Sequence, residues 1–133
     1  MGYPDRVDSA GSRPPAILNL TAATSDDGLM LVDVEGELDA LTLRRWSGLL
    51  DSAITGGATG IAVDLRGCPA IDIGCLSVLV AASGKLKERG DEGIRLVTTP
   101  GSLLRRRVQA TGAKRLSAHS SAGEALRSLR DAA

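Results

Sequence analysis

The sequence predicts a single α/β domain built on a mixed, mostly parallel sheet. Strand-like apolar runs alternate with helix-like periodic segments, turn signals separate them, and 43% of the 133 residues are hydrophobic. This length is sufficient for one hydrophobic core without disulfides or metals. The expected order of elements is β-β-α-β-α-β-α-β-α.

Two strands are expected first, over residues 16–24 and 29–36, with the turn Ser25-Asp-Asp-Gly28 between them. The second strand alternates valines with acidic residues, so one face should be packed and the other wet and acidic. The alternating residues are Val32, Asp33, Val34, Glu35 and Glu37.

Four helices are expected to follow, each with apolar residues at helical spacing on one face. Asp39 is a suitable N-cap for the first, and the last opens with a capping box formed by Ser121 and Glu124. Glycines mark the ends of the first three. The expected helices cover residues 40–55, 73–89, 102–111 and the segment that starts at residue 121.

Three further strands are expected between these helices, over residues 61–65, 94–98 and 115–118. Ile61-Ala-Val-Asp-Leu65 is a nearly continuous apolar run, as in a central strand that is covered on both faces. Because a helix separates each of these strands from the next, the strands should run parallel.

The N-terminal segment differs in composition from the rest of the chain. It is polar, rich in Pro, Gly and Ser, and lacks the apolar core of a signal peptide. We therefore expect a disordered arm over residues 1–15 and a folded domain over residues 16–133. The longest apolar runs, residues 61–63 and 78–82, are too short to span a membrane, so a cytoplasmic protein is expected.

Charge is balanced overall but unevenly distributed. Residues 1–99 hold 14 acidic and 9 basic side chains, a balance of −5, whereas residues 100–133 hold 2 and 7, a balance of +5. Such asymmetry suits the steering of a charged partner. Nucleic acid is not expected as that partner, because the chain has no net positive charge and only Trp46 and Tyr3 as aromatic residues.

Acidic residues are concentrated around the second strand. Six acidic and no basic residues lie between Asp26 and Asp39. This strip is either a solvated sheet face or a recognition surface for an arginine-rich partner. The basic run Arg105-Arg-Arg107 is expected to form a solvated helix face.

Two short boxes give the sequence a family resemblance. Gly36-Glu-Leu-Asp39 precedes the first helix, and Val63-Asp-Leu65 leads to Ile71-Asp72 before the second. With the order of elements, these boxes make residues 16–131 resemble the STAS domain. That family comprises the anti-sigma factor antagonists and the cytosolic tails of sulfate transporters. The resemblance implies a regulatory protein that binds other proteins, is not an enzyme and needs no cofactor.

The antagonist branch of this family implies a switch site at the start of the second helix. There the loop usually reads Asp-Ser-Ser-Gly-Leu, and a partner kinase that is also the anti-sigma factor phosphorylates the first Ser. In this chain Asp72 and Leu76 match the pattern. Ile73 stands at the phosphoacceptor position, Gly74 at the second Ser and Cys75 at the Gly. The resemblance therefore implies an ATP-binding anti-sigma factor as partner, without phosphorylation control at the usual serine.

Ile73 has two interpretations. If the family's contact surface is retained, Ile73 imitates the permanently unphosphorylated state and adds apolar area for a partner. If not, it packs under a neighbouring loop and the partner has been lost. Ser77, one helical turn later, is interpreted as an ordinary helix serine rather than a displaced phosphorylation site. The implied partner-binding residues are Asp39, Asp72, Ile73, Gly74, Cys75 and Ser77.

The two cysteines also have two interpretations. Cys75 lies in the first turn of the second helix, where the helix N-terminus favours a thiolate and the neighbouring Asp72 opposes it. Cys68 falls where the pattern requires a core residue. Both thiols are either packed and inert or a redox switch, so a thiol-gated antagonist is one alternative function.

The motifs give no support for catalysis or metal binding. His119 is the only histidine, is not paired with a nucleophile, and makes a poor zinc set with two cysteines. No phosphate-cradling glycine loop precedes a helix. A second alternative is a small-ligand sensor, in which the loop and helix N-terminus bind a nucleotide, an anion or a lipid. The sequence leaves open whether the domain forms a homodimer.

Overall fold

The computed structural model of the chain describes residues 18–132, so the expected arm lies outside the described residues. The described part has the expected order of strands and α-helices, with one additional 3₁₀ helix, η1. The elements are β1 (Asn19–Thr24), β2 (Leu29–Glu35), α1 (Leu43–Thr55), β3 (Gly60–Gly67), α2 (Ile73–Glu88), β4 (Ile94–Val97), α3 (Leu103–Gln109), η1 (Gly112–Leu116), β5 (Ala118–His119) and α4 (Ala122–Asp131).

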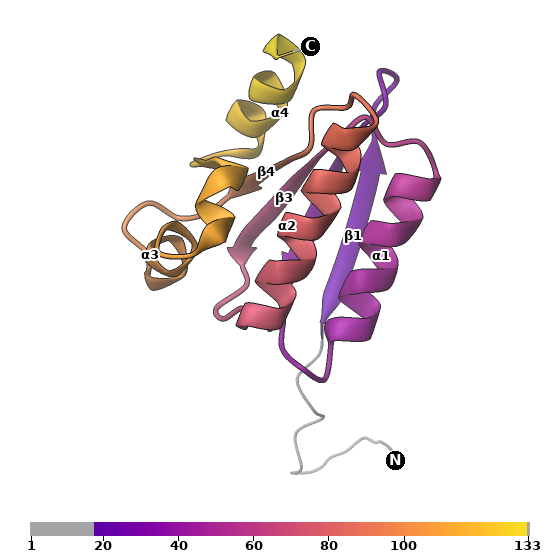
Figure 1. The fold of residues 1–133 in the computed structure, drawn as a ribbon. Helices are drawn as coiled ribbons and strands as arrows, with labels where there is room; N and C mark the ends of the chain where they lie inside the picture. Colours follow the sequence, from indigo (N-terminus) through magenta and orange to yellow (C-terminus); the bar gives the residue numbers. More distant parts are fainter. Residues whose placement is uncertain (1–17, 133) are drawn as a thin grey trace, which may run out of the picture.

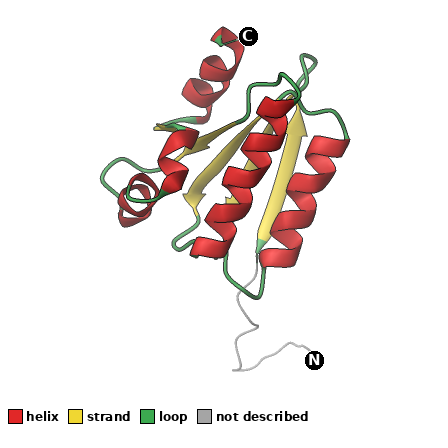
Figure 2. Cartoon of the chain, in the orientation of Figure 1, coloured by secondary structure: helices red, strands yellow, loops and turns green. Residues whose placement is uncertain are grey.

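The strands form one mixed sheet in the order β1-β2-β3-β4-β5. β1 pairs antiparallel with β2, and the remaining neighbours pair in parallel. This confirms the predicted mixed, mostly parallel sheet. Helices α1 and α2 lie side by side across one face of the sheet (Figure 1). Helix α4 packs against the other face, so the domain has helices on both sides of the sheet (Figure 2).

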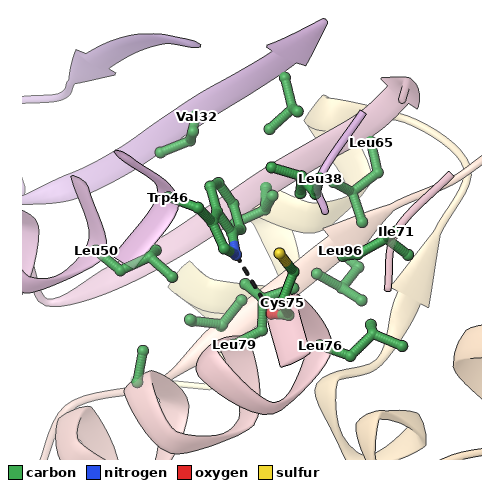
Figure 3. Close-up of a cluster of buried hydrophobic side chains, with 14 of the residues drawn as sticks. Val32, Leu38, Trp46, Leu50, Leu65, Ile71, Cys75, Leu76, Leu79 and Leu96 are labelled. Atoms are coloured by element: carbon green, nitrogen blue, oxygen red, sulfur yellow. Dashed lines mark hydrogen bonds between the residues drawn. The ribbon is translucent and has the colours of Figure 1, made fainter. Parts of the chain in front are cut away.

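The larger core lies between the sheet and α1 and α2. Trp46 of α1 is fully buried there, and its Nε1 donates a hydrogen bond to the carbonyl oxygen of Cys75 in α2 at 3.3 Å (Figure 3). The first six residues of β3 are all buried, which confirms the prediction of a central strand. A smaller cluster on the other face contains Leu29, Ala62, Val97, Ala125 and Leu129.

The first helix begins later than predicted, because Asp39 caps a turn that precedes it. The Oδ1 atom of Asp39 accepts hydrogen bonds from the backbone N–H groups of Leu41, at 2.9 Å, and Thr42, at 3.1 Å. This turn occupies the segment that was expected to open the helix, and α1 starts at Leu43.

The segment before the last helix also differs from the prediction. The expected strand over residues 115–118 is largely replaced by η1, which starts where Thr111 Oγ1 accepts the N–H of Ala113 at 3.2 Å. Ser117 has a φ of 53°, and β5 follows it with two residues. Local capping by the threonine thus outweighs the short strand-like pattern.

Candidate functional site

The site candidates gather at the end of the sheet to which the carboxyl ends of β2 and β3 point. The loop after β2 and the loop after β3 are joined by a bridge between Leu38 and Ile71. The N–H of Leu38 donates to the carbonyl oxygen of Ala70 at 3.1 Å, and the N–H of Asp72 donates to the carbonyl oxygen of Leu38 at 2.9 Å. The structure therefore places Asp39 and Asp72 in adjacent loops. We call the surface around Asp39, Leu41, Asp72 and Ile73 the docking end.

Asp72 fixes the start of α2. It is the N-cap residue, and its Oδ1 accepts the backbone N–H of Cys75 at 2.9 Å. Such a cap satisfies one of the free donors in the first helical turn. The backbone around the predicted switch position is therefore held in a defined geometry.

Ile73 is the first residue of α2, and 60% of it is exposed. Gly74 beside it is half-buried, and Ser77 is exposed one turn later. The Ser77 hydroxyl donates to the carbonyl oxygen of Ile73 at 2.9 Å. Ile73 thus presents apolar area to solvent, whereas the hydroxyl of Ser77 is engaged by the helix.

Two further exposed leucines lie after β2 and β4, Leu41 in the turn before α1 and Leu103 as the first residue of α3. Leu41 is 90% exposed and Leu103 is 75% exposed. Together with Ile73 they are the exposed large hydrophobic residues of the described segment 18–132. Sequence reasoning missed both leucines. Leu41 could have been found as an apolar residue inside the polar turn capped by Asp39.

A shallow groove extends from Ile73 along α2. It has a volume of about 300 Å³ and lies between α2 and η1. Two hydroxyl groups lie at its rim, and both already donate hydrogen bonds. Ser77 donates to the carbonyl oxygen of Ile73, and Thr111 donates to the carbonyl oxygen of Val108 at 3.0 Å. The residues lining the groove are Ile73, Leu76, Ser77, Val80, Ala81, Thr111, Gly112 and Ala113. No charged side chain is among them, so the groove suits apolar groups.

The acidic residues of β2 lie on the sheet face opposite α1 and α2. Val32 and Val34 are buried, whereas Asp33 and Glu35 are exposed, which confirms the predicted alternation. On the adjacent strand β3, Asp64 is buried at 7% exposure and binds Arg66 Nη2 through Oδ2 at 2.7 Å. Burial alone would raise the pKa of Asp64, but the hydrogen bonds from Arg66 hold it below its usual value.

Both cysteines lie inside the larger core rather than on the docking end. Cys75 is fully buried among apolar side chains (Figure 3). Cys68 is 3% exposed, and both thiols are free. Burial, reinforced by the neighbouring carboxylate of Asp72, raises the pKa of Cys75 to about 12. Burial also raises the pKa of Cys68. A protonated, buried thiol is a poor nucleophile, so these surroundings favour the packed interpretation.

The basic run of α3 is only partly solvated. Arg106 and Arg107 are exposed, but Arg105 is half-buried. Its Nε donates to Thr98 Oγ1 at 2.6 Å, and its Nη2 donates to the carbonyl oxygen of His119 at 2.8 Å. The expectation of a solvated face is therefore wrong for Arg105, which ties the ends of β4 and β5 to α3.

His119 lies at the end of β5, under α4. Its Nε2 atom is buried and has no hydrogen-bond partner in the described part of the chain. Burial and the nearby Arg95 lower its pKa. Among residues 18–132, no group of three or more His, Cys, Asp or Glu side chains is arranged to hold a metal ion. No helix within this range is both long and apolar enough to cross a membrane.

Comparison with a family model and with solved structures identifies similar domains. The family model described as "Mlab, STAS domain" matches residues 21–119. Among curated proteins, none matches the sequence significantly.

The similar solved structures include anti-sigma factor antagonists. One from Mycobacterium paratuberculosis has a TM-score of 0.76 and 22% identity, and the match covers 86% of this chain and 96% of that one. SpoIIAA in its unphosphorylated form has a TM-score of 0.71 and 17% identity, over 85% and 97% of the two chains. The Bacillus cell fate determinant SpoIIAA in its phosphorylated form has a TM-score of 0.63 and 16% identity, over 84% and 100%. At these identities, the likenesses establish the fold.

Proposed function

Because the chain belongs to the STAS domain family, we propose that it acts as an anti-sigma factor antagonist in the cytoplasm. In this proposal it is a non-catalytic protein that binds an ATP-binding anti-sigma factor of the serine kinase type. The observation that carries the proposal is the exposed Ile73 at the position that the family resemblance assigns to the phosphoacceptor serine.

The chemistry of the docking end describes the partner. Leu41 in the turn before α1 and Ile73 at the start of α2 offer apolar area. The carboxylates of Asp39 and Asp72 lie in the two adjacent loops that lead to them. A partner that matches this end combines apolar side chains with basic ones. Cys75 is excluded from the contact surface by its burial, so the proposed surface consists of Asp39, Leu41, Asp72, Ile73, Gly74 and Ser77.

The same position explains why binding would not be controlled by phosphorylation. A phosphate adds roughly −1.5 to −2 charges and disrupts an apolar contact. Ile73 has no hydroxyl to accept one, and the hydroxyl of Ser77 is bonded within α2. The antagonist would therefore stay competent to bind in the presence of ATP and an active kinase.

Titration calorimetry against each ATP-binding anti-sigma factor encoded in the same genome, with ADP bound, tests the proposal. We expect one of them to bind tightly and to lose no affinity after prolonged incubation with ATP. Ile73→Glu should weaken binding at least about tenfold, since it places a charge in an apolar contact. Ser52→Glu, an exposed site on α1, adds the same charge elsewhere and should leave affinity unchanged. Binding to none of these proteins would refute the proposal.

The groove beside Ile73 favours a second candidate, a sensor of small apolar ligands. Its lining carries no charge, so a lipid chain fits it better than a nucleotide or an anion. Fatty acids that raise the melting temperature in the absence of any protein partner would favour this candidate. If a nucleotide raised the melting temperature instead, the binding site would have to lie elsewhere than in this uncharged groove.

A redox-gated antagonist is the least supported version of the proposal. Oxidation requires a thiolate that an oxidant can reach, whereas Cys68 and Cys75 are buried and their pKa values are raised. Affinity for the anti-sigma factor should accordingly be the same in reducing and in mildly oxidising buffer.

A further inference from the structure

The strand β1 lies at the edge of the sheet, and no described strand pairs with its outer side. Ser25 donates its N–H to Leu29 at 2.8 Å, and the register pairs Thr24 with Met30 through to Asn19 with Glu35. Because bonded and non-bonded pairs alternate in an antiparallel ladder, residues 19, 21 and 23 bond to β2. Leu20, Ala22 and Thr24 therefore turn their N–H and C=O groups outward.

These outward groups have no backbone partner among residues 18–132. By the same alternation, the carbonyl group of Leu18 also points away from β2. It accepts a hydrogen bond from Arg45 Nη1 of α1 at 2.7 Å, which is consistent with this outward direction. Residues 21–24 of the strand are exposed. Within residues 18–132, the edge is thus open along most of its length.

The sequence of this edge contains none of the features that usually protect an edge strand. Residues 18–24 include no charged residue and no proline, and the pairing with β2 runs without a bulge. Charges, prolines and bulges are the means by which native proteins prevent pairing with a second chain. The opposite edge differs, since β5 has only two residues.

We propose that β1 pairs antiparallel with β1 of a second copy of this chain, about a two-fold axis at Ala22. In this register Ala22 faces Ala22 of the partner, and Leu20 faces Thr24 of the partner. Each outward residue then exchanges both an N–H and a C=O bond. The two sheets become one continuous sheet with an isologous interface.

The distribution of charge supports a second copy as the occupant. In each copy Asp33 lies opposite Thr21 and Leu31 lies opposite Ala23. In the proposed register, Thr21 of one copy faces Ala23 of the other. The side chain of Asp33 in one copy is therefore in line with Leu31, not with Asp33, of the other, and the acidic side chains of the two copies do not face each other. At each end of the paired strands, Thr24 of one copy leads into the turn that carries the exposed Asp26, and this turn comes near Leu18 of the other copy, whose carbonyl holds the exposed Arg45 guanidinium. Opposite charges are thus close to each other at both ends, which favours the pairing.

The test combines mass and amide exchange of the full chain. Light scattering after size exclusion should give twice the monomer mass at high concentration. By NMR, the amides of Leu20, Ala22 and Thr24 should exchange more slowly as concentration rises, whereas those of Thr21 and Ala23 should be protected at every concentration. A monomer at all concentrations would overturn the proposal. Protection of the outward amides that is independent of concentration would also overturn it, since the same chain would then cover the edge.

Two variants at one exposed position keep the test independent of folding defects. Ala22→Pro removes an outward N–H without removing a bond to β2, and Ala22→Lys places like charges opposite each other on the axis. Both should give monomers with an unchanged far-UV spectrum. Ala81→Lys, exposed on α2, adds the same charge away from the edge and should remain a dimer. A dimer that persists in both Ala22 variants would refute pairing through β1.

Discussion

Ile73 determines what the start of α2 can do. The first turn of a helix tolerates a phosphate, because free N–H groups and the positive end of the helix face it. Asp72 caps this turn as it would for a serine at position 73, so the backbone is suited to a phosphoacceptor. The side chain alone makes the surface apolar and unable to accept a phosphate.

Replacing Ile73 by serine should therefore create the switch. In the presence of the anti-sigma kinase and ATP, the Ile73→Ser hydroxyl should take the γ-phosphoryl group, with ADP as the leaving product, and the complex should dissociate. Intact-mass spectrometry follows the modification and calorimetry follows the affinity. The wild-type chain and Ile73→Ala should gain no phosphate. An Ile73→Ser variant that binds the kinase but is never phosphorylated would contradict the assignment of this position.

The cysteines should behave as core residues. Burial and the neighbouring Asp72 keep the Cys75 thiol protonated, with a pKa of about 12, so a thiol reagent at pH 8 should react slowly with the folded protein. We expect the count of free thiols to stay at two after mild peroxide treatment, and both thiols to react at once in denaturant. Loss of a thiol in the folded protein would support redox gating instead.

Asp39 should contribute to stability independently of any partner. Its carboxylate accepts two backbone N–H groups in the turn before α1. Asp39→Ala should lower the free energy of unfolding by about 1 kcal/mol, as for the loss of a helix cap. Urea titration measures the loss, and Asp33→Ala, at an exposed site on β2, serves as the matched control. Equal urea midpoints for the two variants would show that the turn does not depend on Asp39.

At the scale of elements, the hydrophobic periodicity of the sequence correctly predicted which strands and helices form. It did not predict the boundaries that side-chain caps determine. Alternation in β2 and the stripe of α2 reflect burial of one face, the apolar run of β3 reflects burial of both faces, and the structure has all three. The start of α1 and the replacement of a strand by η1 depend on local hydrogen bonds of the Asp39 and Thr111 side chains, which hydrophobic periodicity does not reveal. The exposed leucines were missed for a related reason: Leu41 lies in the turn before α1, and Leu103 is the first residue of α3, outside its buried stripe of Leu104 and Val108.

The packing of β5 under α4 should make stability depend on pH. Burial and Arg95 lower the pKa of His119, while Glu124 on α4 opposes this and Arg105 adds to it. The folded state thus disfavours the imidazolium, whereas the unfolded chain takes up a proton near the ordinary histidine pKa of 6.5. The free energy of unfolding should therefore fall as pH decreases below this value, and His119 should contribute no further change above it.

Urea midpoints between pH 8 and pH 5 measure this dependence. Asp64 also has a lowered pKa, but its contribution is lost only as pH falls through the unfolded value of 3.8, outside this window. His119→Gln should flatten the profile between pH 7 and pH 5. A profile that keeps its slope in this variant would assign the effect to another group.

At the scale of the whole molecule, the docking end and the β1 edge are compatible. β1 begins at Asn19, which lies opposite Glu35 at the end of β2, so the strand starts near the docking end and runs away from it. Antiparallel pairing about Ala22 therefore places the two docking ends at opposite poles of a dimer. Neither pole is covered by the pairing.

This geometry predicts that partner binding and self-association can be separated by mutation. Ala22→Lys should halve the mass of the free protein, yet each protomer should bind the anti-sigma factor with unchanged affinity, because Ile73 and Leu41 are untouched. Ile73→Glu should do the reverse, leaving the dimer intact and weakening binding about tenfold or more. Light scattering and calorimetry on the two variants complete the comparison. If Ala22→Lys also abolished binding while the fold was retained, the two surfaces would have to be parts of one interface, and the two-fold arrangement at β1 would be wrong.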